Sequence, residues 1–565
     1  MIIERLKNKA NTNELITKVL INRGYDEEII NALLSTGYSE ELPAYNDITN
    51  VEIGADIIES HIANNSTIHI FADYDADGTC SSYILGDAIS YAIWTSDSSS
   101  SLNIKVPERY EGYGLNMKWC ESIVDNKSDN ETILVITVDN GIAQDKEVAY
   151  LLSNGIDVLI TDHHMPNGHT PQEVIIIDAF HNNDNINNKG LCGAGVAFKL
   201  AMTLLERYDI KDFDELYYKY LIHVAIATIT DSMPMTIDNI RYVYNGLQLL
   251  KDGYGSDAIN HYKEFNSSTD LTPKDIAFGL GPQINSCGRM CNASLAVDYL
   301  FANDDDVEDL YNSIVKTNDE RKAKTKKAID MAEEMIDINK PGIVLNLVDV
   351  EGIAGIIASN VVNKYRRPTI VFSQAGDVLI GSGRSTDGIN LLSVIKQIEA
   401  NTDYIVKVGG HASACGITIK KQYFNDFCNT LYNALENITV VDNTEEQEEL
   451  RVVVDDYITV SDINKDNCES LRSLYFFTES NPVFALNDIT ITKVKYSGNN
   501  PNNICFDIKD KTGSISTWAW GVGDMYKMLG EPKQVSIIAE LDTKFGKPSL
   551  NILNIIPKGE IEYEK

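Results

Sequence analysis

Short apolar runs recur through the first half of the chain and alternate with longer segments of mixed polarity. The runs cover residues 68–72, 133–138, 158–161 and 174–177. Runs of this length that end in polar residues are typical of strands buried on both faces, and the segments between them are long enough for crossover helices. Residues 51 to about 245 are therefore predicted to form a parallel α/β sheet.

A second α/β pattern and then a β-rich pattern follow toward the end of the chain. Strands are predicted at 342–345 and 369–372, which indicates a further, smaller α/β domain. Nearer the C-terminus short alternating runs dominate, with strands expected at 489–491, 504–508, 514–520, 535–538 and 550–552. Such strands with turns between them predict a small β-barrel of the oligonucleotide-binding kind. Its Trp518, Trp520 and Phe506 could stack on bases or could fill the barrel core.

One long polar helix is predicted between the two α/β patterns, from Asp304 to about Asn339. It begins with acidic residues and turns basic between Arg321 and Lys327. One interpretation is a solvated helix that bridges two domains. The other is a basic wall that faces a phosphate backbone, and the two interpretations are compatible.

Three polar segments carry the strongest chemical signal, because each follows directly after a predicted strand. They are Asp73–Gly78, Asp139–Gly141 and Asp162–His164. The carboxyl ends of parallel strands lie along one crevice of a sheet, so five Asp and two His side chains are expected to converge there. So many carboxylates repel one another unless cations are bound. Mixed carboxylate and imidazole ligands suit Mn²⁺ or Mg²⁺, often as a bridged pair.

The first of these segments also has the form of a calcium-binding loop, Asp-x-Asp-x-Asp-Gly. That loop requires a Glu at its twelfth position, which is occupied here by Ile84. The calcium interpretation is therefore set aside. A further acidic residue, Asp231, ends the strongly apolar segment 221–229 and its polar flank.

Two glycine-rich segments of the second α/β pattern, Gly381–Ser385 and Gly409–Gly416, are candidates for anion binding. Consecutive glycines let backbone N–H groups approach an anion closely. Arg384 and His411 would add charge-assisted contacts with phosphate. An earlier glycine stretch, Gly190–Gly195, does not follow the dinucleotide-binding fingerprint and predicts a tight turn into a helix.

The most informative feature of the amino-acid composition is the net charge. The chain has 48 Lys and Arg against 83 Asp and Glu, a formal charge of −35, which argues against nonspecific adhesion to DNA or anionic membranes. No apolar run reaches transmembrane length, and the first residues lack the apolar stretch of a signal peptide. The nine cysteines are scattered and odd in number, so reduced thiols and a cytoplasmic location are expected.

Taken in order, these motifs resemble those of the DHH phosphoesterase superfamily. Its four metal motifs are matched by Asp73–Gly78, Asp139–Gly141, Asp162–His164 and Thr230–Pro234, and the signature of its associated DHHA1-type domain by Gly409–His411. Segments more particular to the RecJ-like single-stranded-DNA-specific exonucleases are present at 109–116, 281–289 and 381–385. The resemblance covers about residues 60 to 555.

The resemblance implies an α/β fold with a definite domain order. A parallel-sheet DHH domain and a second, smaller α/β domain of the DHHA1 type are joined by a long helix and followed by a C-terminal OB-like β-barrel. The expected segments are a helical lead-in (1–50), the DHH catalytic domain (51–303), the connecting helix (304–340), the DHHA1-type nucleic-acid-binding domain (341–437), and an acidic linker with the OB-like domain (438–565).

The resemblance also implies roles for individual residues. The implied ligands of two Mn²⁺ or Mg²⁺ ions are Asp73, Asp75, Asp77, Asp139, His163 and Asp231, with Asp139 as the bridge. The implied catalytic residues are His164, Asp139 and Asp162. The implied contacts with phosphate and nucleic acid are Arg109, Tyr113, Asn285, Arg289, Ser382, Arg384, Gly409, Gly410 and His411.

The implied function is a metal-dependent 5′–3′ exonuclease that degrades single-stranded DNA to mononucleotides in repair or recombination, through a water activated by two metal ions. One alternative is a DHH phosphodiesterase acting on short oligonucleotides or cyclic dinucleotides, against which the predicted barrel argues, because short substrates need no extended groove. Another is a degenerate DNA-binding scaffold, which should lack the metal ligands that are present here. The expected partner is single-stranded DNA and the expected state a monomer away from membranes, with assistance by a helicase or single-strand-binding protein left open.

Overall fold

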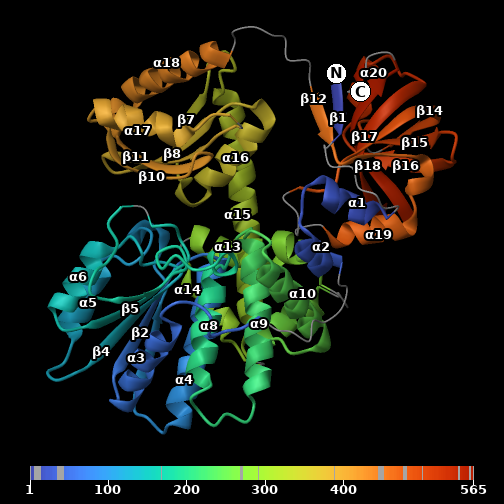
Figure 1. Cartoon of the computed structure of the whole chain (residues 1–565). Coiled ribbons are helices and arrows are strands. Elements are labelled where there is room, and N and C mark those ends of the chain that lie inside the picture. The colour runs from blue at the N-terminus through green and yellow to red at the C-terminus, as the bar shows by residue number, and fades with distance from the viewer. Residues whose placement is uncertain are drawn as a thin grey trace.

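The computed structural model of the chain consists of three lobes, shown in Figure 1. A blue-to-green lobe holds the first sheet, a yellow-to-orange lobe holds the second, and a red lobe holds the barrel together with the blue N-terminal segment. No helix among the described residues is both long and apolar enough to span a membrane. The structure describes residues 2–5, 14–34, 43–166, 168–266, 271–290, 292–303, 305–386, 388–442, 451–474, 480–498, 500–544, 547–558 and 562–563.

A five-stranded parallel sheet forms the centre of the first lobe, in the order β3-β2-β4-β5-β6. Four of these strands are the ones predicted from the apolar runs. The other, β3, is a half-exposed edge strand of mixed residues, so no apolar run could reveal it. The strands are β2 (Thr67–Ala72), β3 (Ser101–Lys105), β4 (Ile133–Val138), β5 (Asp157–Thr161) and β6 (Ile175–Ile177).

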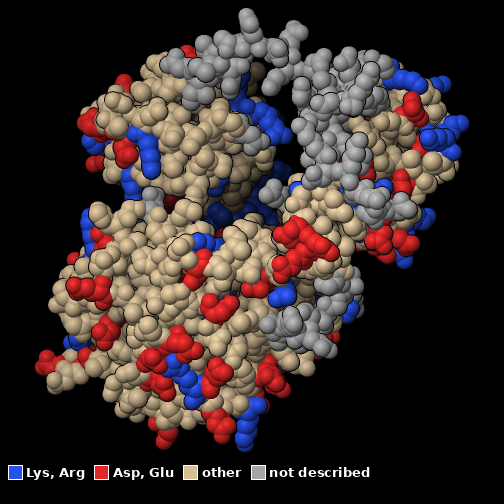
Figure 2. All heavy atoms as spheres, in the orientation of Figure 1, with Lys and Arg blue, Asp and Glu red and all other residues tan. Residues whose placement is uncertain are grey.

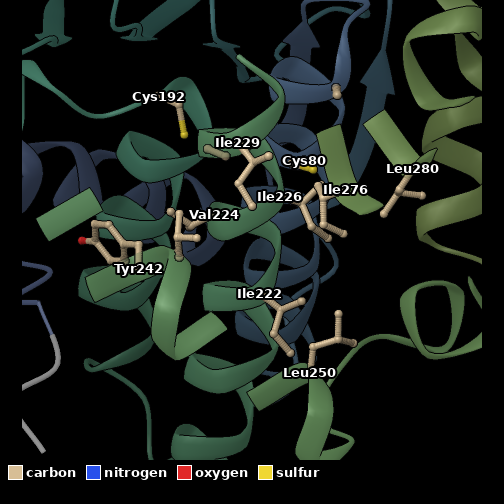
Figure 3. Packing of buried hydrophobic residues seen from close by; sticks show 14 of the residues in the cluster. Cys80, Cys192, Ile222, Val224, Ile226, Ile229, Tyr242, Leu250, Ile276 and Leu280 are labelled. Carbon is tan, nitrogen blue, oxygen red and sulfur yellow. The ribbon is translucent and has the colours of Figure 1, made fainter. Parts of the chain in front are cut away.

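Helices cover both faces of this sheet, as strands buried on both sides require. Helices α3, α4 and α8 pack on one face, with α9 outside α4 and α8, and α5 and α6 pack on the other face. The apolar segment 221–229 is the interior of α9, which is enclosed by α4, α8 and α10 (Figure 3). The helices of this lobe are α3 (Val51–Ala63), α4 (Ala76–Thr95), α5 (Met117–Asn126), α6 (Asp145–Ser153), α7 (Ile186–Lys189), α8 (Gly193–Leu205), α9 (Phe213–Thr230), α10 (Ile237–Asp252), α11 (Asp257–Phe265), α12 (Pro273–Asp275), α13 (Gly281–Arg289) and α14 (Ser294–Leu300), with a π-helical turn at Ile276–Leu280.

The predicted long helix is confirmed as α15 (Val307–Met335), which runs from the first lobe into the second as a single rod (Figure 1). The second lobe has a mixed sheet in the order β10-β11-β9-β8-β7, in which only β7 and β8 are parallel. The predicted acidic linker begins inside α18, and its remainder, 443–450, lies outside the described residues. The elements are β7 (Ile343–Leu347), α16 (Ala354–Tyr365), β8 (Thr369–Ala375), β9 (Val378–Arg384), α17 (Leu391–Asn401), β10 (Ile405–Gly410), β11 (Ala414–Lys420) and α18 (Phe424–Asp442).

The third lobe is the expected barrel, with the strand order β16-β15-β14-β17-β18 and β13 added beside β14. Its outer strands are joined by a side chain, because the Thr517 hydroxyl on β16 accepts a hydrogen bond of 2.9 Å from the Leu550 amide on β18. Phe506 is fully buried in the core, whereas Trp518 and Trp520 stack on each other at 5.7 Å and Trp520 is 44 % exposed. The elements are β13 (Asp456–Ile458), α19 (Lys465–Ser473), β14 (Phe484–Tyr496), β15 (Ile504–Lys509), β16 (Ser514–Ala519), α20 (Gly523–Met528), β17 (Gln534–Lys544) and β18 (Lys547–Pro557).

A strand that we did not predict precedes the helices of the N-terminal lead-in. This strand, β1 (Ile2–Arg5), lies between β12 (Arg451–Val454) and β19 (Glu562–Tyr563) and is parallel to both. Helices α1 (Leu15–Asn22) and α2 (Glu27–Leu34) follow, and the side chains of Asn22 and Arg23 donate hydrogen bonds to Asp455. These contacts anchor the start of the chain to the barrel lobe. The sequence did not predict them, because β1 has only four residues and its partner strands lie far away along the chain.

His223, in the middle of α9, gives the first lobe a predicted sensitivity to acid. The side chain is fully buried, its ring nitrogens lie 2.9 Å from the Lys219 carbonyl and 3.3 Å from the Ser256 hydroxyl, and burial lowers its pKa to about 4. The unfolded chain binds this proton near pH 6.5 and the folded chain near pH 4, so the free energy of unfolding falls as the pH drops through that window. We predict that His223→Gln removes about 2 kcal/mol of the stability loss between about pH 7 and about pH 5, measured by urea unfolding at both pH values.

His169→Gln is the matched control, because the side chain of His169 is exposed. This variant should lose stability with falling pH as the unchanged protein does. The assignment to His223 is wrong if the two variants show the same pH dependence.

Candidate metal centre

The three polar motifs meet at the carboxyl edge of the first sheet. Ala72, Val138 and Thr161 pair with one another across β2, β4 and β5, so the residues that follow them emerge level with one another. Asp73 and Asp139 are two of these residues, and both side chains are buried. Asp139 has a φ of 60°, the left-handed region, so the chain turns sharply at the strand end. The sheet topology therefore produces the convergence that the sequence predicted.

The oxygen and nitrogen atoms of this cluster form three overlapping groups. In each group, one ligand atom per residue lies within 4.8 Å of the others. The groups are Asp73, Asp75 and Asp139; Asp77, His163 and Asp231; and Asp139, His163 and His164. All six residues predicted as metal ligands are thus brought together, and Asp139 and His163 each belong to two groups.

His163 is oriented by a backbone carbonyl. Its Nδ1 lies 3.1 Å from the oxygen of Leu191, so Nδ1 carries the hydrogen and Nε2 offers a lone pair. Nε2 points into the cluster, 3.1 Å from Oδ1 of Asp139, 3.6 Å from Oδ2 of Asp77 and 3.9 Å from Oδ2 of Asp231. An imidazole held in this tautomer by a carbonyl is the usual arrangement of a metal-binding histidine.

The N-terminus of α8 supports Asp77. The amides of Gly193 and Ala194 each donate a hydrogen bond of 2.7 Å to its carboxylate. Gly193 permits this approach, because a Cβ at that position would lie 2.7 Å from the Cβ of Asp139. The predicted turn into a helix is confirmed, and the structure adds that its first amides face the acidic cluster.

The electrostatics of the cluster favour a bound cation. Burial and the neighbouring carboxylates raise the pKa of Asp73 and Asp139 well above the usual range, and raise that of Asp231 to about 8. The buried Oδ1 atoms of Asp73 and Asp139 accept no hydrogen bond from any described residue. Buried carboxylate oxygens without donors are rare in folded proteins unless they coordinate metals. The donor set therefore fits hard divalent cations such as Mn²⁺ or Mg²⁺.

Asp162 holds His164 and does not face the other carboxylates. It is fully buried and accepts hydrogen bonds from the amides of Ile142, His163 and His164. Its Oδ1 also lies 2.8 Å from Nδ1 of His164. Burial disfavours the charged imidazole, but this bond and the charge of Asp162 outweigh burial and raise the pKa of His164 to about 9. The structure thus gives Asp162 a positioning role, whereas the half-exposed His164 can reach a substrate.

Arginine and tyrosine side chains border the acidic cluster. The guanidinium of Arg109 lies over the ring of Tyr74 at 5.1 Å, and the hydroxyl of Tyr113 is 3.3 Å from Nε2 of His164. Burial, together with the charges of Arg109 and Arg321, lowers the pKa of Arg289 to about 10.

Two further side chains near the cluster serve as structural ties. Asn285, predicted to contact nucleic acid, accepts a hydrogen bond of 2.8 Å from the Ala76 amide at the start of α4. Arg289 donates a hydrogen bond of 3.3 Å to the Gly352 carbonyl in the second lobe. A Cβ at position 352 would overlap the Arg289 carbonyl oxygen, so the lobes touch where only glycine fits.

The glycine-rich segments of the second lobe lie mostly in the strands β9, β10 and β11. Gly409 pairs with Gly416, and Gly416 with Ser382, in a row across β10, β11 and β9. Nothing lies within 4 Å of a Cβ placed at Gly409 or Gly416, so this row leaves the backbone open to a ligand. Arg384 donates to the Ser382 hydroxyl beside it. Gly410 and the exposed His411 form the turn that follows.

Several neighbours of the cluster escaped sequence reasoning because their contributions depend on contacts between distant parts of the chain. Tyr74 lies inside a metal motif but contributes its ring to Arg109, and Leu191 contributes only a carbonyl. Gly193 is recognisable only once its distance from Asp139 is known. Arg321 was noted only as part of a basic stretch, and its proximity to Arg289 depends on how α15 crosses the first lobe.

Comparison with protein families gives three matches in the order of the lobes. The DHH family, N-terminal domain, matches residues 67–228, the DHHA1 domain matches 343–437, and the RecJ OB domain matches 454–550. The first match contains the motifs that end β2, β4 and β5, and the last covers the barrel.

Individual relatives agree with these matches. The chain is 30 % identical to the single-stranded-DNA-specific exonuclease RecJ of Escherichia coli over an alignment of 406 residues that covers 68 % of each chain. It is 28 % identical to the RecJ of Haemophilus influenzae over 83 % of each chain. The crystal structure of RecJ from Thermus thermophilus in complex with Mn²⁺ shares the fold, with a TM-score of 0.76 at 20 % identity over 99 % of this chain and 80 % of that one. The chain therefore belongs to the RecJ family of single-stranded-DNA-specific exonucleases.

Proposed function

We propose that this protein is a metal-dependent exonuclease that degrades single-stranded DNA from the 5′ end to mononucleotides in DNA repair or recombination. The observation that carries the proposal is the buried cluster of carboxylates at the carboxyl edge of the sheet, together with the imidazole of His163, whose Nε2 offers a lone pair to a metal ion. The names of the relatives supply the substrate, single-stranded DNA, and the reaction class, an exonuclease. No observation favours the alternative of short oligonucleotides or cyclic dinucleotides.

The ligand groups of the cluster suggest how two ions would be shared. We assign one ion to Asp77, His163 and Asp231 with Asp139, and the other to Asp73 and Asp75, again with Asp139. Asp139 would be the bridge because its carboxylate groups with Asp73 and Asp75 on one side and with His163 on the other, and because its Oδ1 accepts no hydrogen bond from any described residue. When bound, such a pair lowers the pKa of a water molecule and offsets charge on the phosphorus centre during attack.

The surrounding residues bind and orient the substrate. The hydrogen bond and charge of Asp162 raise the pKa of His164, and the exposed ring of His164 is placed to bind the scissile phosphate or to assist the leaving oxygen. Asp162 fixes the ring of His164, and Tyr113 contacts it from the other side. The remaining proposed contacts with flanking phosphates are Arg109, Asn285, Arg289, Ser382, Arg384, Gly409, Gly410 and His411.

Further proposals concern the setting in which the enzyme works. We propose that it acts as a monomer in the cytoplasm, and that a helicase or a single-strand-binding protein supplies or presents its substrate. The division into segments 1–50, 51–303, 304–340, 341–437 and 438–565 is kept as the proposed domain organisation.

Removal of the bridging carboxylate should abolish hydrolysis. We predict that Asp139→Ala releases no product in Mn²⁺ from a single strand labelled at either end, because a substituted alanine offers no ligand oxygen. The unchanged protein should release a labelled mononucleotide early from the 5′-labelled strand and late from the 3′-labelled one. Product analysis of both time courses on denaturing gels measures this.

The control for this experiment is Asp129→Ala, which removes an exposed carboxylate and should leave the time courses unchanged. Early release from the 3′-labelled strand would overturn the polarity. Full activity of Asp139→Ala would overturn the assignment of the bridge.

The close packing of α8 against the cluster should control metal affinity. In Gly193→Ala the added methyl group meets Asp139 and must displace the amides that hold Asp77. We predict that Mn²⁺ binding, measured by isothermal titration calorimetry, weakens roughly 10- to 100-fold, the usual effect of losing a group that orients a ligand. Gly498→Ala, in which the new methyl group meets nothing within 4 Å, should bind Mn²⁺ nearly as the unchanged protein does. Equal affinities of the two variants would contradict this role of Gly193.

A further inference from the structure

A groove lies between α15 and α16, outside the candidate metal centre. It has a volume of about 270 Å³. Polar residues of α15 supply most of its lining and one residue of α16 closes it, and the polar lining residues are Arg321, Lys322, Thr325, Lys326, Asp330 and Asn360. Three of these carry positive charge and Asp330 carries the one negative charge of this lining, so the groove is basic although the whole chain carries −35.

Two of the groove's cations are not neutralised by the protein. The guanidinium of Arg321 donates only to the amide oxygen of Asn318, which is uncharged. Neither Arg321 nor Lys326 has a carboxylate in ion-pair range in the part of the chain that the structure describes, whereas Lys322 pairs with Asp319 and Lys324 with Asp349. Burial lowers the pKa of the half-buried Arg321, which means that its charge is partly stripped of water. Such a charge is stabilised by a bound anion.

The hydroxyl of Thr325 provides a second, independent sign of a ligand. Thr325 is only 8 % exposed, lines the groove, and its Oγ1 has no hydrogen-bond partner among the described residues. Earlier in the same helix Ser313 and Thr317 donate to the carbonyl four residues before them, which is the ordinary solution for a helical hydroxyl. Thr325 does not, and a buried hydroxyl without a partner is unusual unless something else fills the site.

Positively charged side chains extend from the metal centre to the groove. The charge of Arg321 acts on Arg289, which in turn lies near Arg109 and Asp75. Guanidinium groups that repel one another therefore lead from the acidic cluster to the groove. Figure 2 shows Lys and Arg side chains gathered deep in the hollow between the first and second lobes, where α15 passes, whereas acidic side chains spread over the outer face of the first lobe. A single anion could not neutralise all of these positively charged side chains, whereas a polyanionic strand could.

We propose that the groove between α15 and α16 binds a phosphate of the substrate strand beyond the bond being cut. The Thr325 hydroxyl donates a hydrogen bond to a phosphate oxygen, and Arg321 and Lys326 pair with its charge. This inference rests on the proposed function and makes it more specific, because a strand must extend past the metal centre to gain the contact. The groove thereby selects long single strands over dinucleotides.

The test compares the KM values of the full chain with Mn²⁺ for a dinucleotide and for a long single strand of DNA. The double variant Thr325→Val, Lys326→Ala removes one hydroxyl and one charge from the groove with little change of shape at position 325. The ratio of the KM for the long strand to the KM for the dinucleotide should rise roughly five- to tenfold, the usual effect of losing a charge-assisted contact. A merely structural role would raise both KM values together and would overturn the proposal.

A binding measurement gives a second readout that does not require turnover. Fluorescence anisotropy of a labelled strand, with Asp139→Ala as the background to prevent hydrolysis, measures affinity as a function of salt. Loss of one phosphate contact should reduce the slope of log affinity against log salt by about 0.7. An unchanged slope would overturn the proposal.

Lys327→Ala is the matched control, since it removes the same charge from the next residue, which is exposed and does not line the groove. Lys327→Ala should leave the KM ratio and the salt slope unchanged. If it changes them as much as the double variant does, the effect comes from the overall charge of the helix and the proposed binding site is wrong. If the unchanged protein hydrolyses neither substrate, the proposed function fails. The salt slope then still decides whether the groove binds a strand.

Discussion

Repulsion among carboxylates confined at one edge of a sheet is the constraint on which the rest of this structure depends. The parallel strands place Asp73 and Asp139 side by side and buried, and raise their pKa far above the usual range. Among the described residues no lysine or arginine forms an ion pair with these carboxylates, and backbone amides of α8 donate hydrogen bonds to Asp77. The imidazole of His163 adds a further lone pair that faces the cluster. What is left unsatisfied is a set of oxygens suited to divalent cations.

The same constraint explains why opposite charges occupy separate regions. Arginines inside the cluster would form ion pairs with the carboxylates and remove the ligands from use. Instead Arg109 lies over a tyrosine ring and Arg289 donates to a carbonyl, so neither guanidinium group is neutralised by these contacts. On the face shown in Figure 2, acidic side chains spread over the outside of the first lobe, whereas Lys and Arg side chains gather in the hollow between the first two lobes, although the overall charge is −35.

The sequence predicted those parts of the site that depend on local order along the chain. The apolar runs located β2, β4, β5 and β6, and each metal motif is attached to a strand end, so their convergence follows from the sheet alone. The role of Gly193 and the position of Arg321 were not predictable, because each depends on how a distant helix packs against the sheet. The strand β1 was missed for the same reason, since its partners lie at the other end of the chain.

The contact between the first two lobes has a mechanical consequence. The lobes are joined by the rod of α15 and by a second point of support, where Gly352 rests against the Arg289 carbonyl. Two supports prevent the upper lobe from rocking about the rod as a single hinge would allow. The absence of a side chain at residue 352 therefore sets how closely the second lobe approaches the first at this point, because any added carbon atom would push the two backbones apart.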